Sequence, residues 1–305
     1  MVLEHIFPED WLEHKGRYAF ILGIVYSSIA LLIASVLFPG DPALVAVAFT
    51  SMLLLPEMYK IFAIEERQQS MEQKVSLLGL WRDDIEVVRI YIFLFLGILL
   101  VYSAGTMVLD NFQSNSLFRE QLEIRFCNNG GNCDLNAVSG QAVAGQATSG
   151  IFGSQLFMGI LSNNFLVLLA CFILALLTGD GAIFFIVWNA STWGAIFGIT
   201  AKNAALFAGQ HPLYFFMIIM LVVFPHMILE AISYFLAAIS GSVISKDVLL
   251  EDFSSSRFWE VFGFNLYLLL FALLFLVLGA FVETFVLQNV GIYQQIIQMS
   301  MQVVG

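Results

Sequence analysis

The chain has 305 residues, of which 60% are apolar and 11% charged, with 30 Phe and a mean hydropathy of +0.88. Soluble domains are far more polar, so this composition predicts an integral membrane protein that contacts the lipid bilayer as a partner. The net charge is -11, from 23 acidic and 12 basic residues, which removes the electrostatic attraction that nucleic-acid binding requires. We therefore expect no nucleic acid among its partners.

Apolar runs long enough to cross a membrane recur along the whole chain. A crossing needs about 20 residues to span about 30 Å of hydrocarbon. We expect crossings at about 18–38, 43–62, 90–109, 155–177, 181–201, 213–245 and 264–287. The sequence thus predicts an all-α fold, a polytopic transmembrane helical bundle of about seven membrane segments.

The run 213–245 is too long for one straight crossing, and it contains Pro225. A proline inside a helix removes a backbone donor and clashes with the preceding turn. We therefore expect this helix to be broken at Pro225. The pattern allows the run to cross the membrane once or twice.

The distribution of Lys and Arg predicts the orientation, because basic residues concentrate on the cytoplasmic side. With an inside N-terminus and one crossing by 213–245, only Arg119, Arg125 and Lys202 of the 12 basic residues lie outside. This predicts a cytoplasmic N-terminus. The acidic start of the chain, followed by the first apolar run, is expected to act as a retained signal-anchor.

Four regions follow from these patterns. The N-terminal three-span region covers 1–109, and within it the segment 57–89 is expected to form a helical arm at the inner surface, broken near Gly79. It could dock a partner or serve as a solvated connector. A polar extracytoplasmic loop covers 110–154, a transmembrane core covers 155–287, and an amphipathic tail in the interface plane covers 288–305.

The three cysteines predict no metal site. Cys171 lies in an apolar run, whereas Cys127 and Cys133 flank a polar stretch of the loop 110–154. These two thiols could form a disulfide outside the cell or stay free. The chain contains no cysteine pattern of a zinc framework, and we expect no metal and no cofactor.

Several polar side chains interrupt the apolar spans, where they are costly to place in lipid and normally face a bundle interior or a wet cavity. The candidate intramembrane polar cluster consists of Asn163, Asn164, Asn189, His226, Glu230 and Glu283. His226 and Glu230 are four residues apart and therefore share one helical face.

Three interpretations of the His226 and Glu230 pair remain open. The pair could be a buried hydrogen bond that closes a kink at Pro225, it could line a transport or ion pathway, or it could serve intramembrane catalysis. The metal-binding helix of zinc proteases needs a second His, which this segment lacks. The sequence likewise contains no serine–histidine–acid set, phosphate loop or Cys-x-x-Cys motif.

Small residues spaced by four form stripes on two spans. One stripe holds Ala190, Gly194 and Gly198, and the other continues the face of Glu230 through Ser233, Ala237, Gly241 and Ser245. Such stripes let helix backbones approach closely. We expect these two helices to pack against each other.

The pattern over residues 155–287 resembles the stage II sporulation protein M family. The resemblance rests on Ile160-Leu161-Ser162-Asn163-Asn164, on Asn189 with Gly194, on Pro225-His226-x-x-x-Glu230-Ala231 with Gly241, and on Ala280 with Glu283-Thr284-Phe285. The Pro-His-x-x-x-Glu element is the most specific part.

The resemblance implies a multi-pass protein of the cell membrane without known catalytic activity. It also implies a scaffold role, in which exposed loops recruit other membrane or envelope proteins. We therefore expect a non-enzymatic membrane scaffold. The alternative is a transporter or channel with a polar site at His226, Glu230 and Glu283. Low charge and large apolar faces are also compatible with a homo-oligomer.

Overall fold

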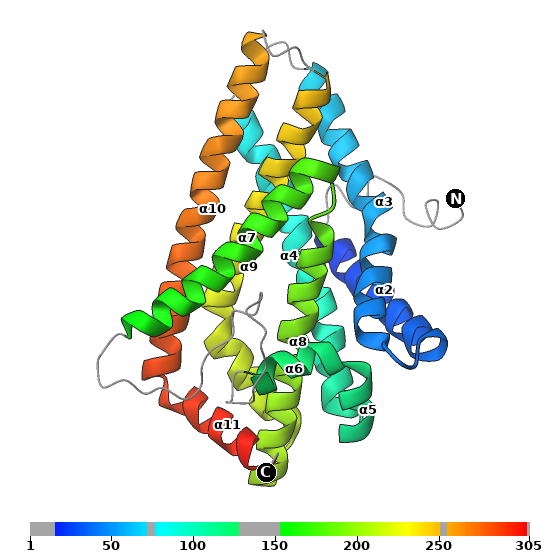
Figure 1. Ribbon diagram of the computed structural model, residues 1–305, viewed down its shortest axis with the longest axis vertical. Helices are drawn as coiled ribbons and strands as arrows, with labels where there is room; N and C mark the ends of the chain where they lie inside the picture. The colour runs from blue at the N-terminus through cyan, green and yellow to red at the C-terminus, as the bar shows by residue number, and fades with distance from the viewer. Residues whose placement is uncertain (1–15, 72–76, 128–152, 251–254, 304–305) are drawn as a thin grey trace.

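The computed structural model describes residues 16–71, 77–127, 153–250 and 255–303, and its elements there are helices (Figure 1). They are α2 (Gly16–Leu37), α3 (Pro42–Met71), α4 (Leu77–Val108), α5 (Asn111–Leu117), α6 (Arg119–Cys127), α7 (Ser154–Thr178), α8 (Ile183–Ala208), α9 (Pro212–Leu250), α10 (Ser256–Asn289) and α11 (Gly291–Gln302).

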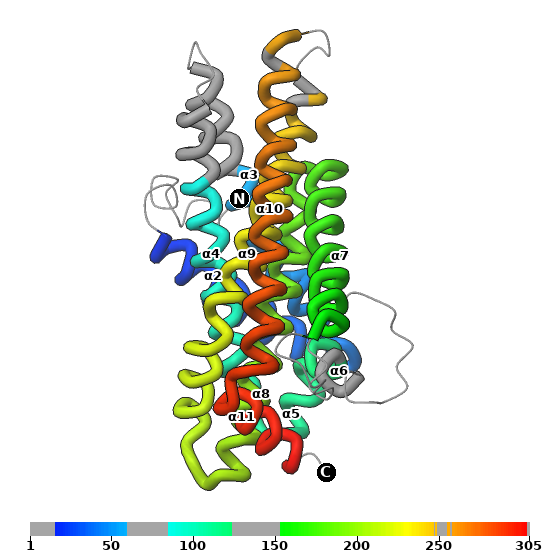
Figure 2. The backbone as a smooth tube through the Cα atoms, turned by 90° about the vertical axis from the view of Figure 1, so that its left-hand side faces the viewer, coloured from blue at the N-terminus to red at the C-terminus, as the bar shows by residue number. Residues whose placement is uncertain are grey.

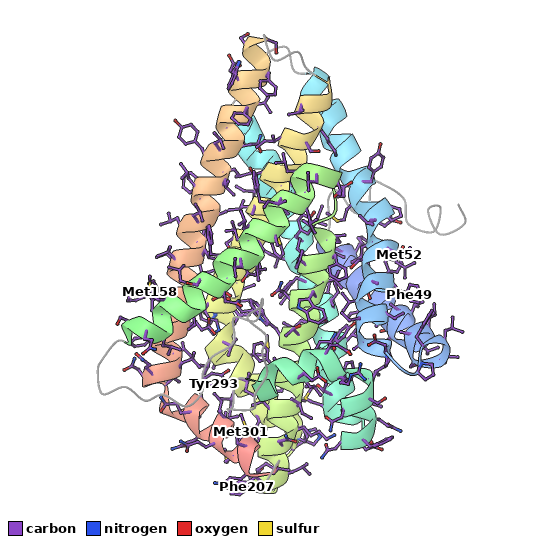
Figure 3. All side chains as sticks on the ribbon, viewed as in Figure 1. Phe49, Met52, Met158, Phe207, Tyr293 and Met301 are labelled. Atoms are coloured by element: carbon purple, nitrogen blue, oxygen red, sulfur yellow. The ribbon has the colours of Figure 1, made fainter. Side chains whose placement is uncertain are left out.

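Seven of the described helices are long and apolar enough to cross a membrane, namely α2, α3, α4, α7, α8, α9 and α10. The expected all-α polytopic bundle of about seven segments is confirmed. Successive spans run in alternating directions, and α7 crosses the others obliquely (Figure 1). Exposed apolar side chains such as Met52 and Met158 project from the outer surface, where lipid would surround them (Figure 3).

Helix α8 lies at the centre of the bundle. Its apolar window is 83% buried, whereas no other span exceeds 50%. It packs against α3 and α4 on one side and against α7 and α9 on the other, so it joins the N-terminal spans to the C-terminal ones. Ala, Gly, Ser and Thr are frequent along α8, and these small side chains allow neighbouring backbones to come close.

The glycines of the two small-residue stripes face different neighbouring helices. A Cβ atom on Gly194 would lie 2.5 Å from the Leu99 carbonyl oxygen of α4, and one on Gly241 would lie 2.5 Å from the Phe172 carbonyl oxygen of α7. The expected packing of α8 against α9 is confirmed. The glycines of the two stripes nevertheless face α4 and α7, because those are the neighbours whose backbones approach most closely.

Helix α9 continues through Pro225 without interruption, so the expected break there is wrong. Proline removes one backbone hydrogen bond, and packing of α7, α8 and α10 along α9 supports the helix on either side of it. A single continuous helix from Pro212 to Leu250 is compatible with one crossing of the membrane. Its 39 residues measure about 58 Å at 1.5 Å per residue, roughly twice the hydrocarbon thickness.

The ends of four long helices project on one side of the bundle. The α3–α4 pair and the α9–α10 pair extend past the connection between α7 and α8 (Figure 1), and Figure 2 shows the α9–α10 projection from the side. Helix α4 begins at Leu77 and passes through Gly79, so the helix boundary lies two residues before the glycine rather than at it. A single glycine costs a helix only about 1 kcal/mol relative to alanine, which the rest of α4 outweighs.

The opposite side carries two short helices where the sequence predicts a polar loop. Asp110 caps α5 by accepting a hydrogen bond of 2.7 Å from the Gln113 amide. Phe118 then inserts against the Tyr102 ring, with 5.5 Å between ring centroids. Apolar insertion of Phe118 explains why 110–127 folds onto the bundle, despite its polar composition.

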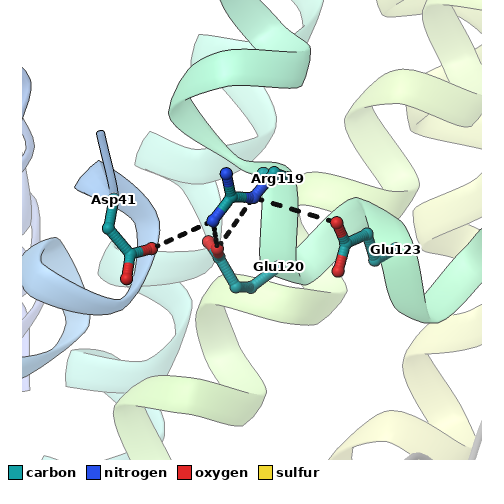
Figure 4. A network of polar contacts seen from close by, with 4 residues as sticks. All are labelled: Asp41, Arg119, Glu120 and Glu123. Atoms are coloured by element: carbon teal, nitrogen blue, oxygen red, sulfur yellow. Dashed lines mark hydrogen bonds and ion pairs between the residues drawn. The ribbon is translucent and has the colours of Figure 1, made fainter. Parts of the chain in front are cut away.

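A charged network ties this layer to the turn between α2 and α3 (Figure 4). Arg119 Nη2 donates to Glu120 Oε1 at 2.7 Å and to Asp41 Oδ1 at 3.4 Å, while its Nε lies 3.8 Å from Glu123 Oε1. Helix α11 covers α8 on the same side and buries Ile296 and Ser300.

The close contact between α4 and α8 gives a prediction. Replacing Gly198 with Ala would place a Cβ atom 2.5 Å from the Ser103 carbonyl oxygen, so the helices must separate. We expect a loss of about 1–3 kcal/mol in the free energy of unfolding, measured by denaturation in detergent micelles. The control is Gly159→Ala in α7, where no described atom lies within 4 Å of the new Cβ. Equal stability of the two variants would contradict the packing argument.

Candidate functional site

Two buried glutamates from different helices meet inside the bundle. Glu230 lies midway along α9 and is 2% exposed, and Glu283 lies within two turns of the end of α10 and is 8% exposed. Their carboxyl groups interact directly. The sequence singles out both residues, and the structure brings them together.

The carboxyl pair has no basic partner. Neither glutamate forms an ion pair with a described Lys or Arg. Two carboxylates in contact repel each other strongly where water is excluded. The pair therefore requires a compensating positive charge that the described side chains do not supply as a salt bridge.

Helix α7 contributes two amides. Asn163 Nδ2 donates to Asn164 Oδ1 at 3.2 Å, and Asn164 directs its own amide toward the Glu230 carboxyl. Asn164 is 2% exposed, and its Nδ2 forms no hydrogen bond of normal geometry. Polar side chains from α7, α9 and α10 thus converge on one buried point.

Gly279 makes room for Glu230, and sequence reasoning missed it. A Cβ atom at this position would lie 2.7 Å from Glu230 Cγ. Gly279 precedes Glu283 by one helical turn, so the two residues share the face of α10 that meets α9. A glycine one turn from an intramembrane carboxyl was the signal in the sequence that could have identified it.

Tyr234 and Cys171 complete the surroundings of the pair. Both side chains are buried, and Tyr234 lies within electrostatic reach of Glu230, Glu283 and Cys171. Ser233 donates to the Glu230 main-chain carbonyl at 2.6 Å and so serves the helix rather than the carboxyl.

His226 does not pair with Glu230. It is 7% exposed, its Nδ1 has no hydrogen-bond partner, and Glu230 interacts with Glu283 and Asn164 instead. The interpretation of a hydrogen bond between His226 and Glu230 is therefore wrong. Residues four apart share a face, but the approach of α10 decides which side chain each one meets.

The remaining sequence candidates lie elsewhere. Asn189 donates to the Phe185 carbonyl of its own helix at 2.8 Å. Ala237 is fully buried in the core. The suggested disulfide between Cys127 and Cys133 lies outside the described side chains. In the described part of the chain no group of three His, Cys, Asp or Glu could hold a metal ion.

A second buried carboxyl lies between α2 and α3. Glu57 is 3% exposed and hydrogen-bonds with Tyr26, which is equally buried. The sequence shows Glu57 as an acidic residue after Pro56 near the end of an apolar run. Its partner on α2 is visible only in the structure.

The fold defines a multi-pass helical membrane protein with a carboxyl pair inside. The sequence profile of the family described as Stage II sporulation protein M matches residues 19–287. The chain therefore belongs to this family. The match includes α2, α3 and α4, so the N-terminal spans are part of the family unit together with the region 155–287. No curated protein and no solved structure matches the chain.

The contact between Gly279 and Glu230 gives a second prediction. Gly279→Ala should push Glu230 away from Glu283 and separate α9 from α10, at a cost of about 1–3 kcal/mol in the free energy of unfolding. Gly263→Ala is the matched control on the same helix, since its new Cβ meets no described atom within 4 Å. Thermal unfolding in lipid nanodiscs would measure both, and an unchanged Tm for Gly279→Ala would refute the close contact.

Proposed function

We propose that the protein is a non-enzymatic scaffold of the cell membrane that recruits membrane or envelope proteins. The observation that supports this is the projection of the α3–α4 and α9–α10 pairs past the rest of the bundle (Figure 1). Helix α10 has 34 residues, or about 51 Å of helix, against about 30 Å of hydrocarbon. The excess length offers helical surface to other proteins.

The proposed topology places these projections in the cytoplasm. With one crossing by α9, the count along the sequence puts nine of the 12 basic residues on the cytoplasmic side. These are Lys15, Arg17, Lys60, Arg67, Lys74, Arg82, Arg89, Lys246 and Arg257. The positive-inside rule then favours a cytoplasmic N-terminus and an extracytoplasmic position for α5, α6 and α11.

Polar contacts anchor the base of the α9–α10 projection. Ser242 donates to the Gly179 carbonyl, and the Lys246 ammonium lies 5.8 Å from the centre of the Tyr59 ring on α3. Burial raises the pKa of Asp180 in the α7–α8 connection, while the charge of Lys246 opposes this shift. These contacts join α3, α9 and the α7–α8 connection, which supports a rigid platform under the projecting ends.

Transport is the second candidate, and the carboxyl pair is the observation in its favour. Ionisable residues at membrane depth often mark ion pathways in transporters. A transporter must expose Glu230 and Glu283 to water on alternate sides of the membrane. The contact of Gly279 with Glu230 favours a closed site and hence the scaffold.

Photo-crosslinking tests the scaffold proposal. A photoreactive residue in place of Trp259, which is 60% exposed on the α10 projection, should form adducts with other proteins in native membranes. The control is the same substitution at Leu274, an exposed residue of the α10 span that should reach only lipid. Only lipid adducts at both positions would count against a scaffold.

Reconstitution separates the scaffold from the transporter. In proteoliposomes the purified protein should carry no ion flux above that of protein-free vesicles, measured with dyes for pH and for Na⁺. A flux that Glu283→Gln abolishes and Glu260→Gln leaves intact would overturn the scaffold proposal, because Glu260 is an exposed carboxyl of the same helix.

A further inference from the structure

We propose that Glu230 and Glu283 form a binding site for one exchangeable proton, which the two carboxyl groups share across the α9–α10 contact. This goes beyond the proposed scaffold function and does not depend on it. The bound proton supplies the positive charge that the described side chains do not provide. It also turns one carboxylate into a hydrogen-bond donor for the other.

The groups that face the pair are acidic or neutral on every helix around it. Helix α10 supplies Glu283, α7 supplies Asn164 and Cys171, and α9 supplies Tyr234 and, one turn from Glu230, His226. None of these forms a salt bridge with either carboxyl in the described structure. Full ionisation would leave two uncompensated charges in a low dielectric, which costs far more than retaining one proton.

Unpartnered polar atoms at the same point indicate a ligand independently of the charges. Asn164 Nδ2, Glu230 Oε1 and Glu283 Oε2 are buried without hydrogen-bond partners, and the Asn164 amide is directed at Glu230. Buried polar atoms normally have partners, so their convergence marks a site with a missing component.

The size of the site favours a proton over a metal cation. Hard cations take about six or more oxygen ligands, and the described residues here offer two carboxyl groups and one amide. The close packing of Gly279 on Glu230 leaves little space for hydrating water. A proton needs only the two facing oxygens.

The proton should exchange with the side of the membrane on which α10 ends. Glu283 lies about 9 Å of helix from Asn289, and Asn164 lies about 15 Å from the start of α7 at Ser154. Along α10, the path from Glu283 to the projecting end at Ser256 is much longer, about 40 Å. In the proposed topology, the extracytoplasmic solution therefore sets the occupancy of the site.

Infrared spectroscopy of the full chain in lipid nanodiscs tests the proposal. The wild type at neutral pH should show the C=O stretch of a protonated carboxyl, shifted in D₂O and lost as the pH rises. Glu230→Gln and Glu283→Gln should each remove this band. Glu260→Gln, which changes an exposed carboxyl of α10, and His226→Gln should leave it, and Glu57→Gln would identify any contribution of the other buried carboxyl.

Each outcome decides the question. A wild-type spectrum without a protonated-carboxyl band, or with a band that only Glu57→Gln removes, overturns the proposal. A band lost on adding Na⁺ at constant pH overturns it in favour of a sodium site. A band that His226→Gln also removes does not belong to the carboxyl pair alone and overturns it too. If both glutamine variants at the pair fail to fold, the D₂O shift and pH titration of the band in Glu57→Gln carry the test alone.

Discussion

Contact between helix backbones is the constraint on which this bundle depends. Lipid tails are as apolar as the side chains they touch, so helices in a membrane associate through close packing rather than through exclusion of water. The crossing of α2 and α4 shows this, since a Cβ atom on Gly23 would lie 2.6 Å from the Leu94 carbonyl oxygen. Gly194 allows an equally close approach of α8 to α4, and Gly241 allows one of α9 to α7. The central position of α8 follows from these approaches.

The carboxyl pair is possible because of the same constraint. Gly279 lets α10 come close enough for Glu283 to reach Glu230, and α7 adds Asn164 from the third side. A polar group in this environment must find its partner within the protein, because neither lipid nor bulk water offers one. The pair therefore joins the consecutive helices α9 and α10, and Asn164 adds α7 to this contact. It stabilises the bundle only while its charge is compensated.

The two sides of the bundle have different constructions. On one side long helices continue past the membrane-spanning length, with Lys246 between Tyr59 and Asp180 at their base. On the other side short elements fold back on the bundle, with Phe118 inserted against Tyr102 and α11 packed on α8. Projecting helical surface on a closed bundle is more useful for binding other proteins than for moving solutes, and this asymmetry underlies the proposed scaffold function.

The sequence by itself determined the helical class, the approximate spans, the family and the main polar residues, because the length and hydropathy of a span depend on neighbouring residues alone. Asn164, Glu230 and Glu283 were recognisable for the same reason. Only the tertiary structure decided that Glu230 meets Glu283 rather than His226, that the stripe of Gly194 faces α4, and that α9 continues through Pro225. Helical periodicity tells which residues share a face, whereas the partner of that face depends on how separate helices cross, and those contacts exist only in the assembled bundle.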